Sequence, residues 1–254
     1  MLNGEGVLLT RPVGQQEALA SRLRAAGATV VSFPVIEIVP RAEAVAAAEA
    51  RELDDAAVSI YVSSNAVAHG IAYGSGKLAA IGPATAAAIE AAGRQVQLRA
   101  DTGFSSEDLL ALPELKDVKG QTVRIVRGSR GRELLAQTLK SRGARVQYLG
   151  VYDRRLPDYS SAAIEQLESR WRGGEIDVIL AMSVESFDNL LELLPESLLP
   201  ELNEARLVTP TARVLKEIEQ RYPGADVTLA DGPDADALLA AVIESLEPPR
   251  NFSP

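Results

Sequence analysis

The segments that decide how this chain folds are Pro34-Val35-Ile36-Glu37-Ile38-Val39-Pro40 and Val151-Tyr152-Asp153-Arg154-Arg155-Leu156-Pro157. Both are rich in β-branched or aromatic residues, which favours extended strands. Prolines bracket the first segment and end the second, and proline disfavours helix at its own position and just before it. Neither segment leads directly into a sequence with helical periodicity. We therefore predict that the two segments pair as a two-stranded connector between two lobes.

The rest of the chain carries four strand–helix units that each occur twice, in the order A, B, C, D, A′, B′, C′, D′. Unit A has a strand at 7–9, a helix at 15–26 ended by Gly27, and a strand at 29–31. Unit A′ matches it with a strand at 123–126, a helix at 133–142 ended by Gly143, and a strand at 145–149. The strands that begin B, C and D and their repeats lie at 59–62, 78–81, 96–98, 178–182, 206–209 and 227–229, each before a helical segment.

The two connector segments fall directly after A and after A′, which divides the chain into interleaved lobes. One lobe is residues 41–149. The other is discontinuous, residues 1–33 plus 158–254, and the inter-domain linker is residues 34–40 and 150–157. The chain crosses out once and back once, so we expect an antiparallel pair. Alternation of strands and helices predicts an α/β fold in which each lobe is a doubly wound, flavodoxin-like parallel sheet.

Ligands of doubly wound sheets bind beyond the carboxyl ends of the strands. The segments at those ends supply hydroxyls, free backbone N–H groups and helix N-termini, which suit carboxylate or phosphate groups. They are Thr10-Arg11-Pro12, Ser63-Ser64-Asn65, Gly82-Pro83-Ala84-Thr85, Arg127-Gly128-Ser129, Ser183-Val184-Glu185-Ser186 and Thr209-Pro210-Thr211. Two such lobes on a flexible pair of strands predict a cleft for a large anionic molecule.

Composition excludes several classes of chemistry. The 254 residues contain no cysteine and one histidine, His69, so disulfides, thiolate chemistry and multi-histidine metal sites are excluded. Neither a signal-peptide pattern nor an apolar run of about 20 residues is present, so we expect a cytoplasmic protein without a membrane partner. The net charge of −9 argues against a nucleic-acid partner.

The charge is uneven, because residues 120–155 carry nine basic and two acidic side chains, or +7, which leaves −16 for the remainder of the −9 total. The basic residues are Arg124, Arg127, Arg130, Arg132, Lys140, Arg142, Arg145, Arg154 and Arg155. The simplest interpretation is a solvated basic face, and the sharper one is that a few of these residues face an anionic ligand.

Other motifs are weak. Gly74-Ser75-Gly76-Lys77 looks like part of a P-loop, but Leu78 stands at the Ser/Thr position and the segment precedes a strand. His69 is interpreted as an ordinary helix residue, and Trp171 and Phe187 as core or rim residues. Tyr152 by itself would be a strand aromatic that pads the connector.

The order and spacing of six short motifs resemble the uroporphyrinogen-III synthase family over residues 6–246. They are Leu9-Thr10-Arg11-Pro12, Val62-Ser63-Ser64-Asn65-Ala66-Val67, Ile81-Gly82-Pro83-Ala84-Thr85-Ala86, Val151-Tyr152, Val208-Thr209-Pro210-Thr211-Ala212 and Asp234-Ala235-Asp236-Ala237-Leu238-Leu239. One departure is Thr209, where the family often has glycine.

The resemblance implies an enzyme that closes hydroxymethylbilane, a linear polycarboxylate tetrapyrrole, into uroporphyrinogen III with inversion of ring D and loss of water. It implies no cofactor and no metal, and we expect a monomer. It also implies that Tyr152 is the catalytic proton donor, since a phenol, with an ordinary pKa of about 10, is protonated at neutral pH. The implied substrate-binding residues are Thr10, Arg11, Ser63, Ser64, Asn65, Gly82, Thr85, Arg127, Gly128, Ser183, Ser186 and Thr211.

Two alternatives stay open from the sequence. A hinged two-lobe protein of this kind could bind an anionic small molecule without reacting with it. A scaffold or regulatory module descended from the enzyme would keep the fold and lose the activity.

Overall fold

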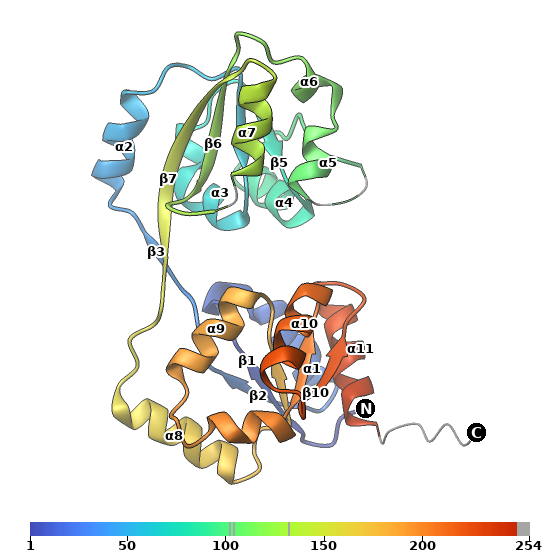
Figure 1. Cartoon of the computed structure of the whole chain (residues 1–254). Helices are drawn as coiled ribbons and strands as arrows, with labels where there is room; N and C mark the ends of the chain where they lie inside the picture. The colour runs from blue at the N-terminus through green and yellow to red at the C-terminus, as the bar shows by residue number, and fades with distance from the viewer. Residues whose placement is uncertain (102, 104, 132, 248–254) are drawn as a thin grey trace, which may run out of the picture. The chain divides into compact units, whose positions relative to one another are not determined.

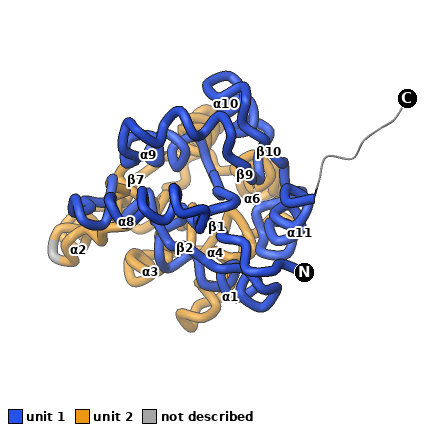
Figure 2. Tube along the Cα trace, turned by 90° about the horizontal axis from the view of Figure 1, so that it is seen from below, with its two compact units in different colours: residues 1–37, 156–254 blue, residues 38–155 orange. Residues whose placement is uncertain are grey.

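The computed structural model describes residues 1–101, 103, 105–131 and 133–247 of the chain (Figure 1). Arg132 of the basic segment lies outside the described residues. The chain divides into two compact units, unit 1 with residues 1–37 and 156–254, and unit 2 with residues 38–155 (Figure 2).

Unit 1 is built on a five-stranded sheet in the order β10-β9-β8-β1-β2, in which every adjacent pair is parallel. The strands are β1 (Gly6–Leu9), β2 (Thr29–Ser32), β8 (Val178–Leu180), β9 (Arg206–Thr209) and β10 (Asp226–Leu229). Numbered along unit 1 alone, the order is 2-1-3-4-5, the flavodoxin order, whose ligands bind where the direction of winding reverses. That reversal lies between β1 and β8.

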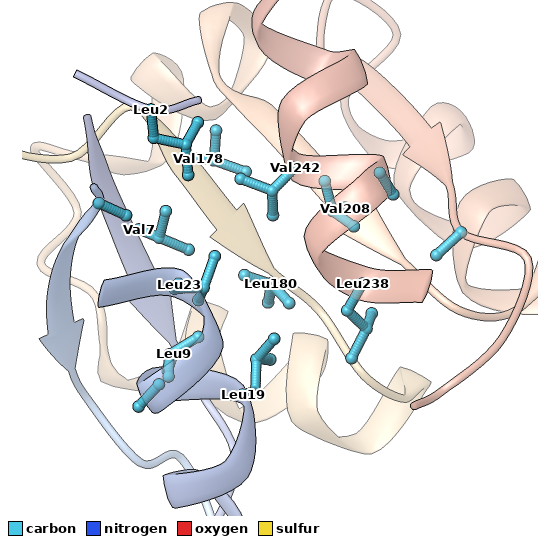
Figure 3. Packing of buried hydrophobic residues seen from close by; sticks show 14 residues of the cluster. Leu2, Val7, Leu9, Leu19, Leu23, Val178, Leu180, Val208, Leu238 and Val242 are labelled. Atoms are coloured by element: carbon cyan, nitrogen blue, oxygen red, sulfur yellow. The ribbon is translucent and has the colours of Figure 1, made fainter. Parts of the chain in front are cut away.

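The helices of unit 1 bury apolar residues at helical spacing. They are α1 (Glu17–Ala25), α8 (Ser161–Arg172), α9 (Val184–Leu193), α10 (Ala212–Arg221) and α11 (Ala235–Leu246), with 3-10 turns η1 (Val13–Gln15) and η3 (Leu199–Glu204). Figure 3 shows Leu19 and Leu23 of α1 and Leu238 of α11 gathered around Leu180 of β8. The intervening strand residues Leu8, Ile179 and Leu207 are also buried, so both faces of the sheet are covered.

Unit 2 has a second five-stranded sheet, in the order β3-β7-β6-β4-β5. Its strands are β3 (Glu37–Pro40), β4 (Val58–Tyr61), β5 (Lys77–Ala80), β6 (Thr122–Gly128) and β7 (Arg145–Arg155). The pairs among β7, β6, β4 and β5 are parallel, and a single bridge from Ala79 to Leu98 extends the sheet beyond β5. The predicted strand at 96–98 is thus reduced to this bridge.

Helices cover both faces of the unit 2 sheet. Residues of α5 (Ser106–Leu110), α6 (Pro113–Lys116) and α7 (Leu134–Ser141) share one buried cluster with Ile60 and Ile125. Residues of α3 (Ser64–Gly70) and α4 (Pro83–Ala91) share another with Val126 and Leu149. The remaining elements are α2 (Glu43–Arg51) and the turn η2 (Ile71–Tyr73). The α/β class with parallel sheets, predicted from the alternation of strands and helices, is therefore confirmed.

The two predicted connector segments contain β3 and the second half of β7, and the chain crosses between the units within both of them. Residues 34–37 fall in unit 1, whereas β3 and β7 are neighbours at the edge of the sheet of unit 2 (Figure 1). The segment 150–155 is not a separate strand, because β7 continues through it from Arg145 without interruption. Pairing at the sheet edge accounts for the position of β3 beside β7, since the nearest open sheet edge best satisfies the backbone groups of an extended segment.

Candidate active site

The predicted site residues lie at the carboxyl ends of the parallel strands in each unit. In unit 1, Thr10 and Arg11 follow β1, Ser183 and Ser186 follow β8, and Thr211 follows β9. In unit 2, Ser63, Ser64 and Asn65 follow β4, Gly82 and Thr85 follow β5, and Arg127 and Gly128 end β6. Each unit therefore gathers its own set along one edge of its own sheet, the edge at which such folds bind ligands.

Tyr152 and Ser63 are the pair that the structure of unit 2 brings into direct contact. The phenol oxygen of Tyr152 lies 3.2 Å from Oγ of Ser63. The side chain of Tyr152 is 5% exposed and packs beneath α3 with Leu149 and Val151. These two residues come from strands that are not adjacent, β7 and the end of β4, so their contact needs the exact path of both.

A shift in strand register puts Tyr152 on this face. Arg127 pairs with Gly150, but the next residue, Gly128, pairs with Tyr152, so Val151 is an extra residue in β7. Side chains alternate between the faces of a regular strand, so without the shift Tyr152 would lie opposite Val151. With it, Val151 and Tyr152 both point toward α3.

The ring of Tyr152 is held from several sides. A Cβ atom at Gly128 would lie 2.9 Å from Cε2 of Tyr152, so only glycine leaves room for the ring there. The amide of Ser129 donates to the Tyr152 carbonyl oxygen at 2.9 Å. The ring of His69 lies 6.4 Å from that of Tyr152, between centroids and tilted by 53°. Gly128 therefore contributes space around Tyr152, which its predicted role as a substrate-binding residue did not include.

Hydroxyls at the strand ends mostly cap the following helices. Ser63 caps α3 through the amide of Ala66, Thr211 caps α10 through that of Val214, and Ser183 forms a reciprocal capping box with Ser186 on α9. Gly82 caps α4 without a side chain, and Thr85 in the first turn of α4 is buried. Ser64 and Asn65 are half-buried in the first turn of α3.

Arg127 is occupied by partners that the sequence interpretation missed. Its side chain is buried, Nη1 lies 3.0 Å from a carboxylate oxygen of Glu133, and the guanidinium lies over the Tyr148 ring at 5.0 Å. The hydroxyl of Tyr148 donates to Glu133. Hydrogen bonds from Tyr148 and Arg127 lower the pKa of Glu133, while burial and the Glu133 carboxylate raise the pKa of Tyr148 to about 12. The only signal in the sequence was one acidic residue, Glu133, beyond a glycine-rich loop.

A cavity of about 490 Å³ adjoins this network within unit 2. Arg41 lies at its wall, where its guanidinium forms two hydrogen bonds to Glu49 and donates to the carbonyl oxygen of Gly150 at 3.0 Å. Both arginines of the cavity, Arg41 and Arg127, thus already have carboxylate partners. We conclude that Arg127 anchors the loop after β6 and does not present a free charge.

Arg11 in unit 1 differs from Arg127 in its electrostatic surroundings. Its guanidinium is half-buried, and among the described residues no hydrogen bond or ion pair to it is recorded. Burial lowers the pKa of Arg11, as expected when a cation loses water without gaining a carboxylate. The neighbouring Thr10 is fully buried and donates its hydroxyl hydrogen to the carbonyl oxygen of Leu180, so it ties β1 to β8.

The solvated basic face, the simplest interpretation of residues 120–155, is wrong for several of its members. Arg124 is buried in β6 and donates to the carbonyl oxygens of Tyr73 and Asp54. Arg142 donates at 2.8 Å to the carbonyls of Leu110 and Leu115. These two cations bind loop backbones. The exposed positions, where the simplest interpretation holds, are those of Arg130, Lys140, Arg145, Arg154 and Arg155.

The family model described as uroporphyrinogen-III synthase HemD matches residues 17–240. The chain belongs to the uroporphyrinogen-III synthase family. It is 31% identical to the uroporphyrinogen-III synthase of Escherichia coli K12 and 33% identical to that of Salmonella typhimurium LT2, in each case over 93% of this chain and 99% of the relative.

A solved structure shares the fold. The crystal structure of uroporphyrinogen-III synthetase from Helicobacter pylori matches with a TM-score of 0.63 and 14% identity, over 95% of this chain and 99% of the other. The resemblance of the six motifs to the uroporphyrinogen-III synthase family is confirmed by the family match and by the two enterobacterial relatives.

No described helix combines the length and apolar character that a membrane span requires. Within the same residues, no three His, Cys, Asp or Glu side chains are grouped so that they could hold a metal ion. Among the described residues, this uroporphyrinogen-III synthase family member places capping hydroxyls at its strand ends, the half-buried guanidinium of Arg11 after β1, and the buried phenol of Tyr152 within β7.

Proposed function

We propose that this protein closes hydroxymethylbilane to uroporphyrinogen III, inverting ring D and releasing water. The observation that carries the proposal is membership of the uroporphyrinogen-III synthase family over nearly the whole chain. A polycarboxylate substrate fits strand ends that offer amide, hydroxyl and guanidinium donors. We propose Thr85, Ser64, Asn65, Arg11, Ser183, Ser186 and Thr211 as the residues that bind its carboxylates.

The reaction needs the terminal hydroxyl of the substrate to leave as water. Electron release from the adjacent pyrrole nitrogen breaks the carbon–oxygen bond, and the Tyr152 phenol gives the departing oxygen its proton. The resulting azafulvene is attacked by the substituted carbon of ring D, which forms a spiro intermediate that fragments and recloses in the inverted sense. A proton released as the last pyrrole regains aromaticity restores the phenol, so the sum is one substrate to one product and one water.

General acid assistance of this kind is worth about 10²–10⁴-fold, so Tyr152 supplies only part of the acceleration. Holding the two ends of a flexible tetrapyrrole together is an entropic contribution that can be larger. The residues at the strand ends therefore matter as a group. The geometry of Tyr152 supports this role, because its phenol is buried and its oxygen lies 3.2 Å from the hydroxyl oxygen of Ser63.

We further propose that one chain acts alone in the cytoplasm, as a monomer and without a cofactor. Tyr152, Ser63 and Gly128 all come from the same unit of the same chain, which supports this proposal. We also propose that residues 34–40 and 150–157 act as the flexible linker between domains 1–33 plus 158–254 and 41–149, with β3 and β7 running antiparallel. Its support is that both crossings of the chain between the units fall within these segments.

The first experiment supplies the protein with hydroxymethylbilane generated enzymatically in situ and identifies the isomer formed. We expect the type III isomer. Spontaneous closure gives type I, so a product of type I alone would contradict the proposed activity. The protein would then be either a two-lobe protein that only binds an anionic molecule or a descendant of the enzyme without activity.

The second experiment replaces the proton donor. We expect Tyr152→Phe to lower kcat by about 10²–10⁴-fold with the type III product retained. An unchanged rate would remove Tyr152 from the chemistry without contradicting the activity itself. A larger loss would mean that the phenol does more than donate a proton.

A further inference from the structure

We propose that Ser63 is a positioning residue that determines which way the phenol proton of Tyr152 points. This inference rests on the proposed function, because it assigns Ser63 to proton transfer in place of its predicted contact with a substrate carboxylate. Ser63 stands at the end of β4, and its Oγ has two polar neighbours, the amide nitrogen of Ala66 at 3.1 Å and the hydroxyl of Tyr152 at 3.2 Å.

Either hydroxyl can donate to the other, and we assign Ser63 as the donor. A backbone amide can only donate, so Oγ of Ser63 accepts from Ala66. The hydroxyl hydrogen of Ser63 then has one acceptor recorded among the described residues, the phenol oxygen of Tyr152. If Ser63 donates to that oxygen, the hydrogen of Tyr152 cannot lie between the two and must point away from Ser63, free for transfer.

The same bond changes in strength during the reaction. A phenol that has given up its proton can only accept, and a hydrogen bond to an ionised acceptor is about twice as strong as a neutral one. Ser63 therefore favours the state that follows proton transfer over the state that precedes it. Interactions that strengthen in this way raise kcat and leave substrate binding unchanged.

Unit 1 shows that capping alone does not require this arrangement. Ser183 caps α9 as Ser63 caps α3. Its hydroxyl, however, donates to the hydroxyl oxygen of Ser186 in the same capping box, at 3.2 Å, and no tyrosine contact is recorded for it among the described residues. The contact with a phenol is thus a separate feature of Ser63, added to a role in the helix that a serine fulfils without it.

The test separates the hydroxyl from the cap. Glycine is a favourable N-cap, so Ser63→Gly removes the hydroxyl while it keeps α3 almost as stable. We expect kcat to fall about tenfold, the factor for one charge-assisted hydrogen bond, with KM within about twofold of wild type. Ser63→Thr keeps the hydroxyl and should restore kcat. The matched control is Ser160→Gly, which removes a hydroxyl that caps α8 through Ala163 and should leave kcat unchanged.

A double-mutant cycle completes the experiment. In a Tyr152→Phe background, the change Ser63→Gly should slow the enzyme no further, because the proton that Ser63 positions is gone. Equal slowing in both backgrounds, or a raised KM with unchanged kcat, would overturn the inference and leave the proposed function standing. Wild-type protein that forms no type III isomer would overturn both. Thermal melting of every variant shows whether a lost rate reflects lost folding.

Discussion

Four strands of each unit have the same spatial order, β2-β1-β8-β9 in unit 1 and β7-β6-β4-β5 in unit 2, but equivalent residues have different partners. Leu9 pairs with Leu180 in unit 1, and Ile125 pairs with Ile60 in unit 2. Ser183 lies three residues after Leu180, and Ser63 lies three residues after Ile60. Both serines cap the helix that follows. If the serines are matched, Leu9 corresponds to Ile125, and Arg11, two residues on, corresponds to Arg127.

These equivalent arginines have opposite electrostatic states. Arg127 is buried against Glu133 and Tyr148, so its charge is neutralised within the loop that it anchors. Arg11 is half-buried without a recorded partner in the described chain, and the lowered pKa follows from that. In unit 2 the arginine thus holds the loop beside Tyr152, whereas the proposed role of Arg11 in unit 1 is to bind an anionic ligand.

The largest expected effect tests Gly128, the residue after Arg127 in unit 2. We expect Gly128→Ala to lower kcat by about 10²-fold, the low end for lost general acid catalysis, because its Cβ would displace the Tyr152 ring. The measurement is the initial rate of type III formation. The control, Gly14→Ala, introduces the same methyl where no other atom lies within 4 Å, and should be silent.

A Gly128→Ala enzyme with an unchanged kcat would contradict the role assigned to Gly128. It would show that the ring can move without loss, so the register shift in β7 would be a packing feature and not a catalytic one. A crystal structure of the variant would show whether the phenol still meets Ser63.

A smaller effect is expected from exchanging each arginine for glutamine. Arg11→Gln should raise KM by about 10–100-fold, the worth of a hydrogen bond to a carboxylate, and leave the free energy of unfolding unchanged or slightly higher. Arg127→Gln should lower the free energy of unfolding by about 1–2 kcal/mol, because it removes a buried partner of Glu133. Substrate titration and urea unfolding measure the two quantities.

The reverse pattern, a raised KM for Arg127→Gln and lost stability for Arg11→Gln, would contradict the assigned roles. It would mean that Glu133 releases Arg127 when substrate binds. Glu133→Gln distinguishes this case, since freeing Arg127 would then lower KM.

The sequence predicted the α/β class and the strand ends because both depend on local periodicity and on glycine, serine and proline at turns. It could not predict the single extra residue in β7, since Val151 and Tyr152 read as ordinary alternation. The pairing of Arg127 with Glu133 and Tyr148 was also hidden, because it joins residues across a loop and an adjacent strand. Ser63 was found for its position, but its contact with Tyr152 depends on the path of β7.

The smallest expected effect concerns the helix caps that follow β9 in unit 1 and β5 in unit 2. Val208 pairs with Leu180 and Ala79 with Ile60, so Thr211 and Gly82, each three residues on, are equivalent caps of α10 and α4. Thr211→Gly therefore gives unit 1 the cap that unit 2 already has. It should change the free energy of unfolding by only a few tenths of a kcal/mol, because glycine is itself a tolerable cap.

The informative quantity for Thr211→Gly is then KM. The hydroxyl of Thr211 accepts from the amide of Val214 at 3.4 Å, which uses a lone pair and leaves the hydroxyl hydrogen to donate to an incoming carboxylate. We expect KM to rise by about tenfold, the low end for one hydrogen bond to a charged group, while kcat is kept. An unchanged KM would show that Thr211 only caps α10, and that the two strand ends differ in residue but not in role.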